Sequence, residues 1–303
     1  MKHLKNYTKM NDDVFIFAIA YNCGKVLNKM LESFHEHHDA KIHIIGTHRD
    51  FKDAMKHENN EYIEVSTDEQ LKEYFKQGHL GTSYVWAKVM SGHYGVCKKI
   101  IQIDSDVIFR EECLSDILDK FNEGYDLIGP RRPYKNIKTI PAHMEESQVR
   151  NLEDVVSTFF IGVNLEKVGS YDFNTLHRMI AGYYNPIGHA IIDFFDPISF
   201  DIIKNGGKIY YLDFKEYGST DDEGSSDNGF ENMNVLFDFG SKIIHFAGIG
   251  SGMNFYYNGN GNVPETYTEW AKKRFSLFMK VFYNEEINFE YGQEEYESIK
   301  KYF

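Results

Sequence analysis

Two aspartates, Asp104 and Asp106, stand on either side of Ser105 directly after the apolar run 100–103. If that run is a buried strand, the two carboxylates lose hydration and repel each other unless a cation lies between them. Carboxylate oxygens suit Mg²⁺ or Mn²⁺, and an ion held by few protein ligands keeps positions open for substrate phosphates. The pair therefore predicts a divalent metal site that binds a diphosphate, although a solvated acidic turn would show the same pattern.

A third metal ligand is expected at His245, near the end of the strand-like run 242–246. The turn that follows contains Gly248 and Gly250. Glycine-rich backbone lets N–H groups approach a phosphate closely, which favours a ligand-binding turn. A single histidine is as often structural as a ligand, so both interpretations of His245 stay open.

These residues must be positioned by the elements that precede them. From residue 14 to residue 103, strand-like runs alternate with helix-like ones, which indicates a parallel sheet with helical crossovers. Ligands bind beyond the carboxyl ends of the strands in such sheets, so the residues after Ala20 and Ile103 are expected to face a ligand. The expected strands are 14–20, 41–46, 62–65 and 99–103, and the expected helices are 25–37, one from residue 68, and 81–94.

After Pro130 the pattern is less regular, with short segments rich in Tyr, Phe and Gly. The segment 216–231 is acidic and contains several glycines, which predicts a loop. The other expected elements are strands at 157–165, 208–214 and 242–246 and an amphipathic helix at 266–282.

Charge and composition exclude several classes of partner. The chain has 303 residues and a formal charge of −13, which repels nucleic acid, so a nucleic-acid partner is not expected. No apolar run approaches the roughly 20 residues of a membrane-spanning helix, so no membrane span is expected. Three cysteines without paired spacing suit a reducing compartment, which favours the cytoplasm of a cell or of an infected host.

Taken together, these segments resemble glycosyltransferases of the GT-A fold, in particular the retaining group that includes glycogenin and the bacterial lipopolysaccharide galactosyltransferases. The resemblance covers residues 14–110, 157–168 and 242–252. It implies an α/β fold with a Rossmann-like mixed sheet flanked by helices, in one continuous domain. Residues 1–130 would form the half that binds the nucleotide sugar, and residues 131–303 would form an irregular acceptor-binding half with C-terminal helices.

The resemblance also assigns roles to single residues. Ala20, Tyr21 and Asn22 end the first strand over the nucleotide, where Tyr21 would stack on the base and Asn22 would hydrogen-bond it. Lys88, at the end of the segment Gly-Thr-Ser-Tyr-Val-Trp-Ala-Lys, would face the diphosphate. The remaining implied contacts are Asp104, Asp106 and His245 to Mn²⁺ or Mg²⁺, the residues Asp104, Ser105, Asp106, Gly248 and Gly250 to the nucleotide, and the strand 159–163 to the donor sugar.

Three features depart from the pattern of this family. The Lys-Pro-Trp that follows the family's His-x-x-Gly turn is replaced here by Gly-Ser-Gly-Met at 250–253, and the Asn of the donor strand is Phe160. The Asp-Gln pair near the reacting carbon has only Asp193 as its counterpart. Apolar neighbours would constrain the Asp193 carboxylate, so Asp193 is the expected nucleophile or base, ahead of Asp222 and Glu223. Lys88 is the other expected catalytic residue, because the resemblance places it where it would assist the diphosphate. A charge at a helix N-terminus explains Asp193 equally well.

The expected activity is metal-dependent transfer of a sugar, with retention, from a UDP-linked donor to a hydroxyl of a glycan or other acceptor. A phosphatase of the haloacid dehalogenase type also uses Asp-x-Asp after a strand, but normally after its first strand. A nucleotidyltransferase would need a basic glycine-rich loop after the first strand. A non-enzymatic carbohydrate-binding module would explain the aromatic residues but not the aspartate pair. A glycosyltransferase of DNA would fit the basic stretch 131–138 but not the charge of −13.

Overall fold

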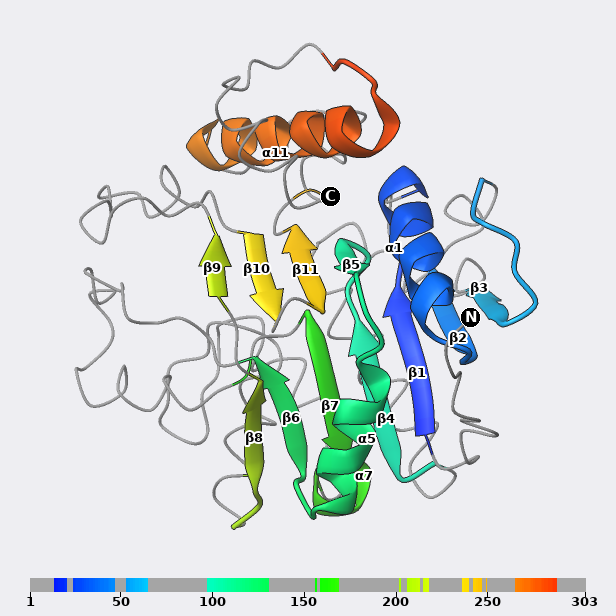
Figure 1. Cartoon of the computed structure of the whole chain (residues 1–303), viewed down its shortest axis with the longest axis vertical. Helices are drawn as coiled ribbons and strands as arrows, with labels where there is room; N and C mark the ends of the chain where they lie inside the picture. Colours follow the sequence, from blue (N-terminus) through cyan, green and yellow to red (C-terminus); the bar gives the residue numbers. More distant parts are fainter. Residues whose placement is uncertain are drawn as a thin grey trace, which may run out of the picture.

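Two β-sheets organise the protein, as seen in a computed structural model (Figure 1). The smaller sheet lies between the larger sheet and a long helix near the C-terminus. The structure describes residues 14–20, 24–46, 53–64, 97–130, 156, 159–168, 202, 206–212, 215–217, 236–239, 242–246, 249 and 265–287.

The larger sheet has seven strands and mixed direction. Its first four strands are mutually parallel, as predicted, whereas β7 runs antiparallel to both β4 and β6. This arrangement confirms the predicted α/β class with a mixed sheet flanked by helices. In spatial order the strands are β3 (Asn60–Glu64), β2 (Ile42–Gly46), β1 (Val14–Ile19), β4 (Lys99–Ile103), β7 (Phe160–Asn164), β6 (Leu127–Pro130) and β8 (Ile209–Leu212).

The smaller sheet has four antiparallel strands. It joins β5, which follows β4 after a short turn, to strands from the C-terminal part of the chain. The sequence pattern did not predict β5 or β10, and the prediction of a loop at 216–231 was wrong for residues 216 and 217, which lie in β9. In spatial order the strands are β5 (Val107–Phe109), β11 (Ile243–Phe246), β10 (Leu236–Phe239) and β9 (Lys215–Tyr217).

Helices α1 (Gly24–His37) and α5 (Leu114–Asn122) each bury one apolar face. The buried apolar residues of α1 recur at intervals of three and four residues, which is the helical repeat that the sequence shows. The short helix α7 (Leu165–Val168) directly follows β7. The buried apolar residues are Val26, Leu27, Met30, Leu31 and Phe34 in α1, and Leu114, Ile117 and Phe121 in α5.

The predicted helix near the C-terminus is α11 (Glu265–Tyr283), which packs on the smaller sheet and reaches α1. The ring of Phe246 in β11 contacts Phe278 and Phe282 at centroid distances of 5.5 and 5.6 Å. The Tyr283 hydroxyl donates a hydrogen bond of 2.7 Å to the carbonyl of Lys25, in the first turn of α1. These contacts connect the end of the described chain to the segment that follows β1.

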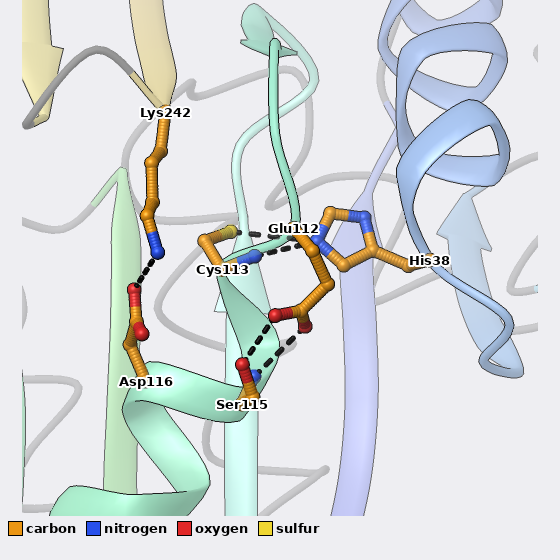
Figure 2. A network of polar contacts seen from close by, with 6 residues as sticks. All are labelled: His38, Glu112, Cys113, Ser115, Asp116 and Lys242. Carbon is orange, nitrogen blue, oxygen red and sulfur yellow. Dashed lines mark hydrogen bonds and ion pairs between the residues drawn. The ribbon is translucent and has the colours of Figure 1, made fainter. Parts of the chain in front are cut away.

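A polar network joins the end of α1, the start of α5 and the start of β11 (Figure 2). His38 Nε2 accepts the Cys113 N–H at 3.1 Å, and Glu112 accepts the N–H of Ser115 at 2.9 Å. Lys242 forms an ion pair of 2.6 Å with Asp116. Glu112 thus supplies an acceptor for the first turn of α5, because the side chain of Cys113 at the N-cap makes no capping hydrogen bond to the helix and lies 3.5 Å from His38 Nε2 instead.

The buried position of His38 makes stability depend on pH. Burial lowers the pKa of His38 from an ordinary 6.5 to about 4. The unfolded chain therefore protonates His38 more readily than the folded chain does. The free energy of unfolding keeps its full contribution from neutral His38 above pH 6.5 and loses it as pH falls towards 4. We expect the free energy of unfolding to fall by about 2 kcal/mol between about pH 7 and pH 5 from this residue alone, measured by urea unfolding.

His35 and His43 also have pKa values lowered by burial, so the wild-type slope alone does not isolate His38. His38→Gln keeps a donor and an acceptor but cannot titrate, and should flatten the pH dependence by the stated amount. An unchanged slope in this variant would contradict the assignment.

Gly162 in β7 makes room for α5. A Cβ atom at this position would lie 2.9 Å from Ile117 Cγ2 and 2.9 Å from Phe121 Cζ. We expect Gly162→Ala to lower the free energy of unfolding by about 1–3 kcal/mol, measured by urea unfolding, because the core must shift to admit the methyl group. Gly24→Ala is the matched control, since nothing lies within 4 Å of a Cβ there, and equal losses in both variants would contradict the steric explanation.

Candidate metal centre

Three potential metal ligands meet where the two sheets join. Asp104 directly follows β4, Asp106 directly precedes β5, and His245 lies in β11, paired in register with Val107. The ligand atoms of these three side chains all lie within 4.8 Å of one another, and Asp106 Oδ1 is 3.2 Å from His245 Nε2. Among the residues that the structure describes, no other group of three or more such side chains comes together.

The backbone at the two aspartates is held by neighbouring strands. The N–H of Asp104 donates a hydrogen bond of 2.8 Å to the carbonyl of Phe159, just before β7. The carbonyl of Asp106 accepts a hydrogen bond of 2.9 Å from the N–H of Phe246. The turn between β4 and β5 is therefore attached to one strand of each sheet.

The site is largely closed to solvent. The whole residues Asp106 and His245 are each 9% exposed, while Asp104 and Ser105 are half-buried. Two carboxylates at such short range are costly without positive charge nearby. A divalent cation would supply that charge.

The geometry fits one cation of moderate size. Ligands about 2.1 Å from an octahedral ion lie about 3 Å apart when adjacent, which agrees with the 3.2 Å between Asp106 and His245. Small side-chain rotations would bring the ligand atoms of all three residues to one ion, because none is more than 4.8 Å from another. The donor set of two carboxylates and one imidazole suits a first-row divalent ion.

The imidazole of His245 is fixed by an aromatic ring. Phe159 stacks on it with centroids 4.1 Å apart and planes 14° from parallel. The sequence predicted that the segment 159–163 lines the donor sugar, and did not predict this contact. Phe159 therefore touches the cluster twice, through its carbonyl to Asp104 and through its ring to His245.

Ala20 also lies at this edge of the larger sheet. Its N–H donates a hydrogen bond of 2.8 Å to the carbonyl of Ile45. Because Ala18 pairs in register with Ile103, Ala20 lies at the edge of the sheet where Ser105 follows β4. The other residues to which the sequence assigned a role lie outside the described residues, namely Tyr21, Asn22, Lys88, Asp193, Gly248 and Gly250.

Comparison with known proteins gives distant structural similarity alone. No family model matches the sequence, and no curated protein does. The chain is similar in structure to mouse xyloside xylosyltransferase 1 in its apo form, with 13% identity, a TM-score of 0.41, and coverage of 66% of this chain and 85% of that chain.

Two structures of LgtC are also similar to the chain. An active-site mutant has 14% identity and a TM-score of 0.46, and the match covers 84% of this chain and 98% of that chain. The galactosyltransferase LgtC in complex with donor and acceptor sugar analogs has 14% identity and a TM-score of 0.46, with 86% and 95% covered. The three structures belong to two proteins, a xylosyltransferase and a galactosyltransferase by name.

Within the described ranges, no helix has the length and apolar character required to cross a bilayer.

Asp106→Asn tests whether the cluster binds a cation. Loss of a hydrogen bond to a metal ligand typically weakens metal binding by about 10- to 100-fold. Removing the charge of a ligand itself should weaken Mn²⁺ binding by more than this, measured by calorimetric titration of the metal alone. Asp119→Asn makes the same chemical change on the exposed face of α5 and should bind Mn²⁺ like the wild type. Equal affinities in both variants would place the ion elsewhere.

Proposed function

We propose that the chain is a metal-dependent glycosyltransferase that moves a sugar from a nucleotide diphosphate sugar, with UDP as the nucleotide, to an acceptor hydroxyl. The observation that carries this proposal is the Asp104, Asp106 and His245 cluster at the carboxyl end of β4. Ligands of α/β sheets bind beyond the carboxyl ends of strands, so a cation held here would face a substrate.

A cation bound at the cluster would let this acidic chain accept a diphosphate. The chain has a formal charge of −13, and two carboxylates line the cluster, so a diphosphate alone would be repelled. When bound, a divalent ion supplies Lewis-acid stabilisation of the charge on the departing diphosphate. The imidazole of His245 favours Mn²⁺ over Mg²⁺, because Mg²⁺ prefers oxygen ligands.

The remaining roles belong to the proposal. Tyr21 and Asn22, which directly follow Ala20, would contact the base, Gly248 and Gly250 would approach the phosphates, and Lys88 would assist the diphosphate. The transfer breaks the bond from the anomeric carbon to the diphosphate oxygen and forms a bond from that carbon to the acceptor oxygen, while the proton of the acceptor hydroxyl passes to the departing diphosphate. With retention, Asp193 would act as a nucleophile or the acceptor would attack on the face of the leaving group.

The cellular setting is also part of the proposal. Cys97 and Cys113 are buried free thiols, and burial raises the pKa of Cys113 well above its usual range. Such cysteines suit a reducing compartment, so we place the enzyme in the cytoplasm.

A panel of nucleotide sugars tests the activity. We expect release of UDP from one UDP-sugar with Mn²⁺ present, loss of that release in EDTA, and little release by Asp106→Asn. Asp119→Asn should release UDP like the wild type, and the anomeric configuration of the product, determined by NMR, should match that of the donor. Hydrolysis of a generic phosphoester through an aspartyl phosphate, with no nucleotide binding, would instead indicate a phosphatase.

A further inference from the structure

Gln102 is a buried amide in an otherwise apolar strand. Its side chain lies in β4, where Ile100, Ile101 and Ile103 are fully buried, and Gln102 itself has no exposed surface. An amide loses its hydration on burial, whereas a leucine at the same position would not incur this cost. A polar residue at this position calls for a partner.

One partner of this amide is a candidate ligand of the metal centre. Gln102 Nε2 donates a hydrogen bond to Asp104 Oδ1. Side chains two apart on an extended chain point to the same side, which explains how residue 102 reaches residue 104. The main chain of Gln102 is flanked in register by Phe17 in β1 and Ile161 in β7, so the amide starts from a rigid position in the middle of the sheet.

We propose that Gln102 is a positioning residue, whose hydrogen bond to Oδ1 fixes the Asp104 carboxylate in the orientation that suits a cation shared with Asp106 and His245. This inference rests on the metal-dependent function proposed above. Gln102 orients the side chain, while the hydrogen bond from the Asp104 N–H to the Phe159 carbonyl orients the main chain.

The chemistry of the amide suits this task. A lysine or arginine at position 102 would neutralise Asp104 and compete with the cation, and a glutamate would add a third negative charge. A glutamine donates a hydrogen bond without changing the charge of the site. Asp104 therefore keeps its full charge for the ion while one of its oxygens is held in place.

Gln102→Met tests the proposal, because methionine has a similar length and volume but no donor. With the full chain and Mn²⁺ alone, we expect calorimetric titration to give an affinity about 10- to 100-fold weaker than that of the wild type. The thermal midpoint in EDTA should change little. Ile100→Val is the matched control, since it disturbs the packing of the same strand without touching Asp104, and it should bind Mn²⁺ as the wild type does.

The outcomes separate two failures. If the wild type binds no Mn²⁺, the proposed metal centre is wrong. If the wild type binds Mn²⁺ and Gln102→Met binds it equally well, the metal centre stands and the positioning role is overturned. If Gln102→Met has a lower thermal midpoint in EDTA but an unchanged Mn²⁺ affinity, Gln102 has a role in packing alone.

A measurement on the wild type covers the case in which the variant does not fold. With glutamine labelled with ¹⁵N, titration of Mg²⁺ should shift one slowly exchanging side-chain amide, because the cation withdraws charge from the carboxylate that this amide contacts. Through-bond correlation of the side-chain amide with its own backbone, measured on the folded wild type, would assign that signal to Gln102. The absence of any shifted amide at saturating Mg²⁺ would overturn the proposal.

Discussion

The pairing of β5 with β11 is the constraint on which the candidate metal centre depends. It places His245 opposite Val107, one residue after Asp106, and it adds the hydrogen bond from the Phe246 N–H to the Asp106 carbonyl. A slip of one residue would turn the imidazole to the other face of the sheet, because side chains alternate along a strand. The register is maintained by packing, since Phe246 inserts against α11 and the neighbouring isoleucines of β11 are buried.

Neighbouring uncharged side chains orient the cluster. Two of its three ligands have an identified orienting contact: Phe159 stacks on His245, and Gln102 donates to Asp104. Neither contact adds charge, so both can fix direction without reducing the attraction of the carboxylates for a cation. Rigid elements supply both contacts, because Gln102 lies within a central strand and Phe159 immediately precedes another. A site built this way is organised before any ligand arrives.

The sequence predicted the local features of this arrangement but few of the long-range ones. The strand before Asp104, the parallel order of the first four strands and the strand that carries His245 follow from local hydrophobic patterns. The pairing of β5 with β11 joins residues far apart in the chain, and β5 is only three residues long, too short for a periodic signal. Phe159 was visible only as part of an apolar strand. Gln102 did carry a signal, since an amide among isoleucines needs a partner and the nearest polar side chain on its face is Asp104.

The position of the cluster gives a cation a structural role beside its chemical one. Asp104 and Asp106 belong to the turn between the sheets, and His245 belongs to the smaller sheet, so an ion bound to all three would cross-link a turn to a strand distant in sequence. Anything that binds the folded chain alone stabilises it, by about 2.7 kcal/mol at a free concentration about 100 times the dissociation constant. Without the ion, the same carboxylates repel each other within a mostly buried site. The residues that would suit the site to a diphosphate would thus also make the junction of the two sheets depend on a bound ion.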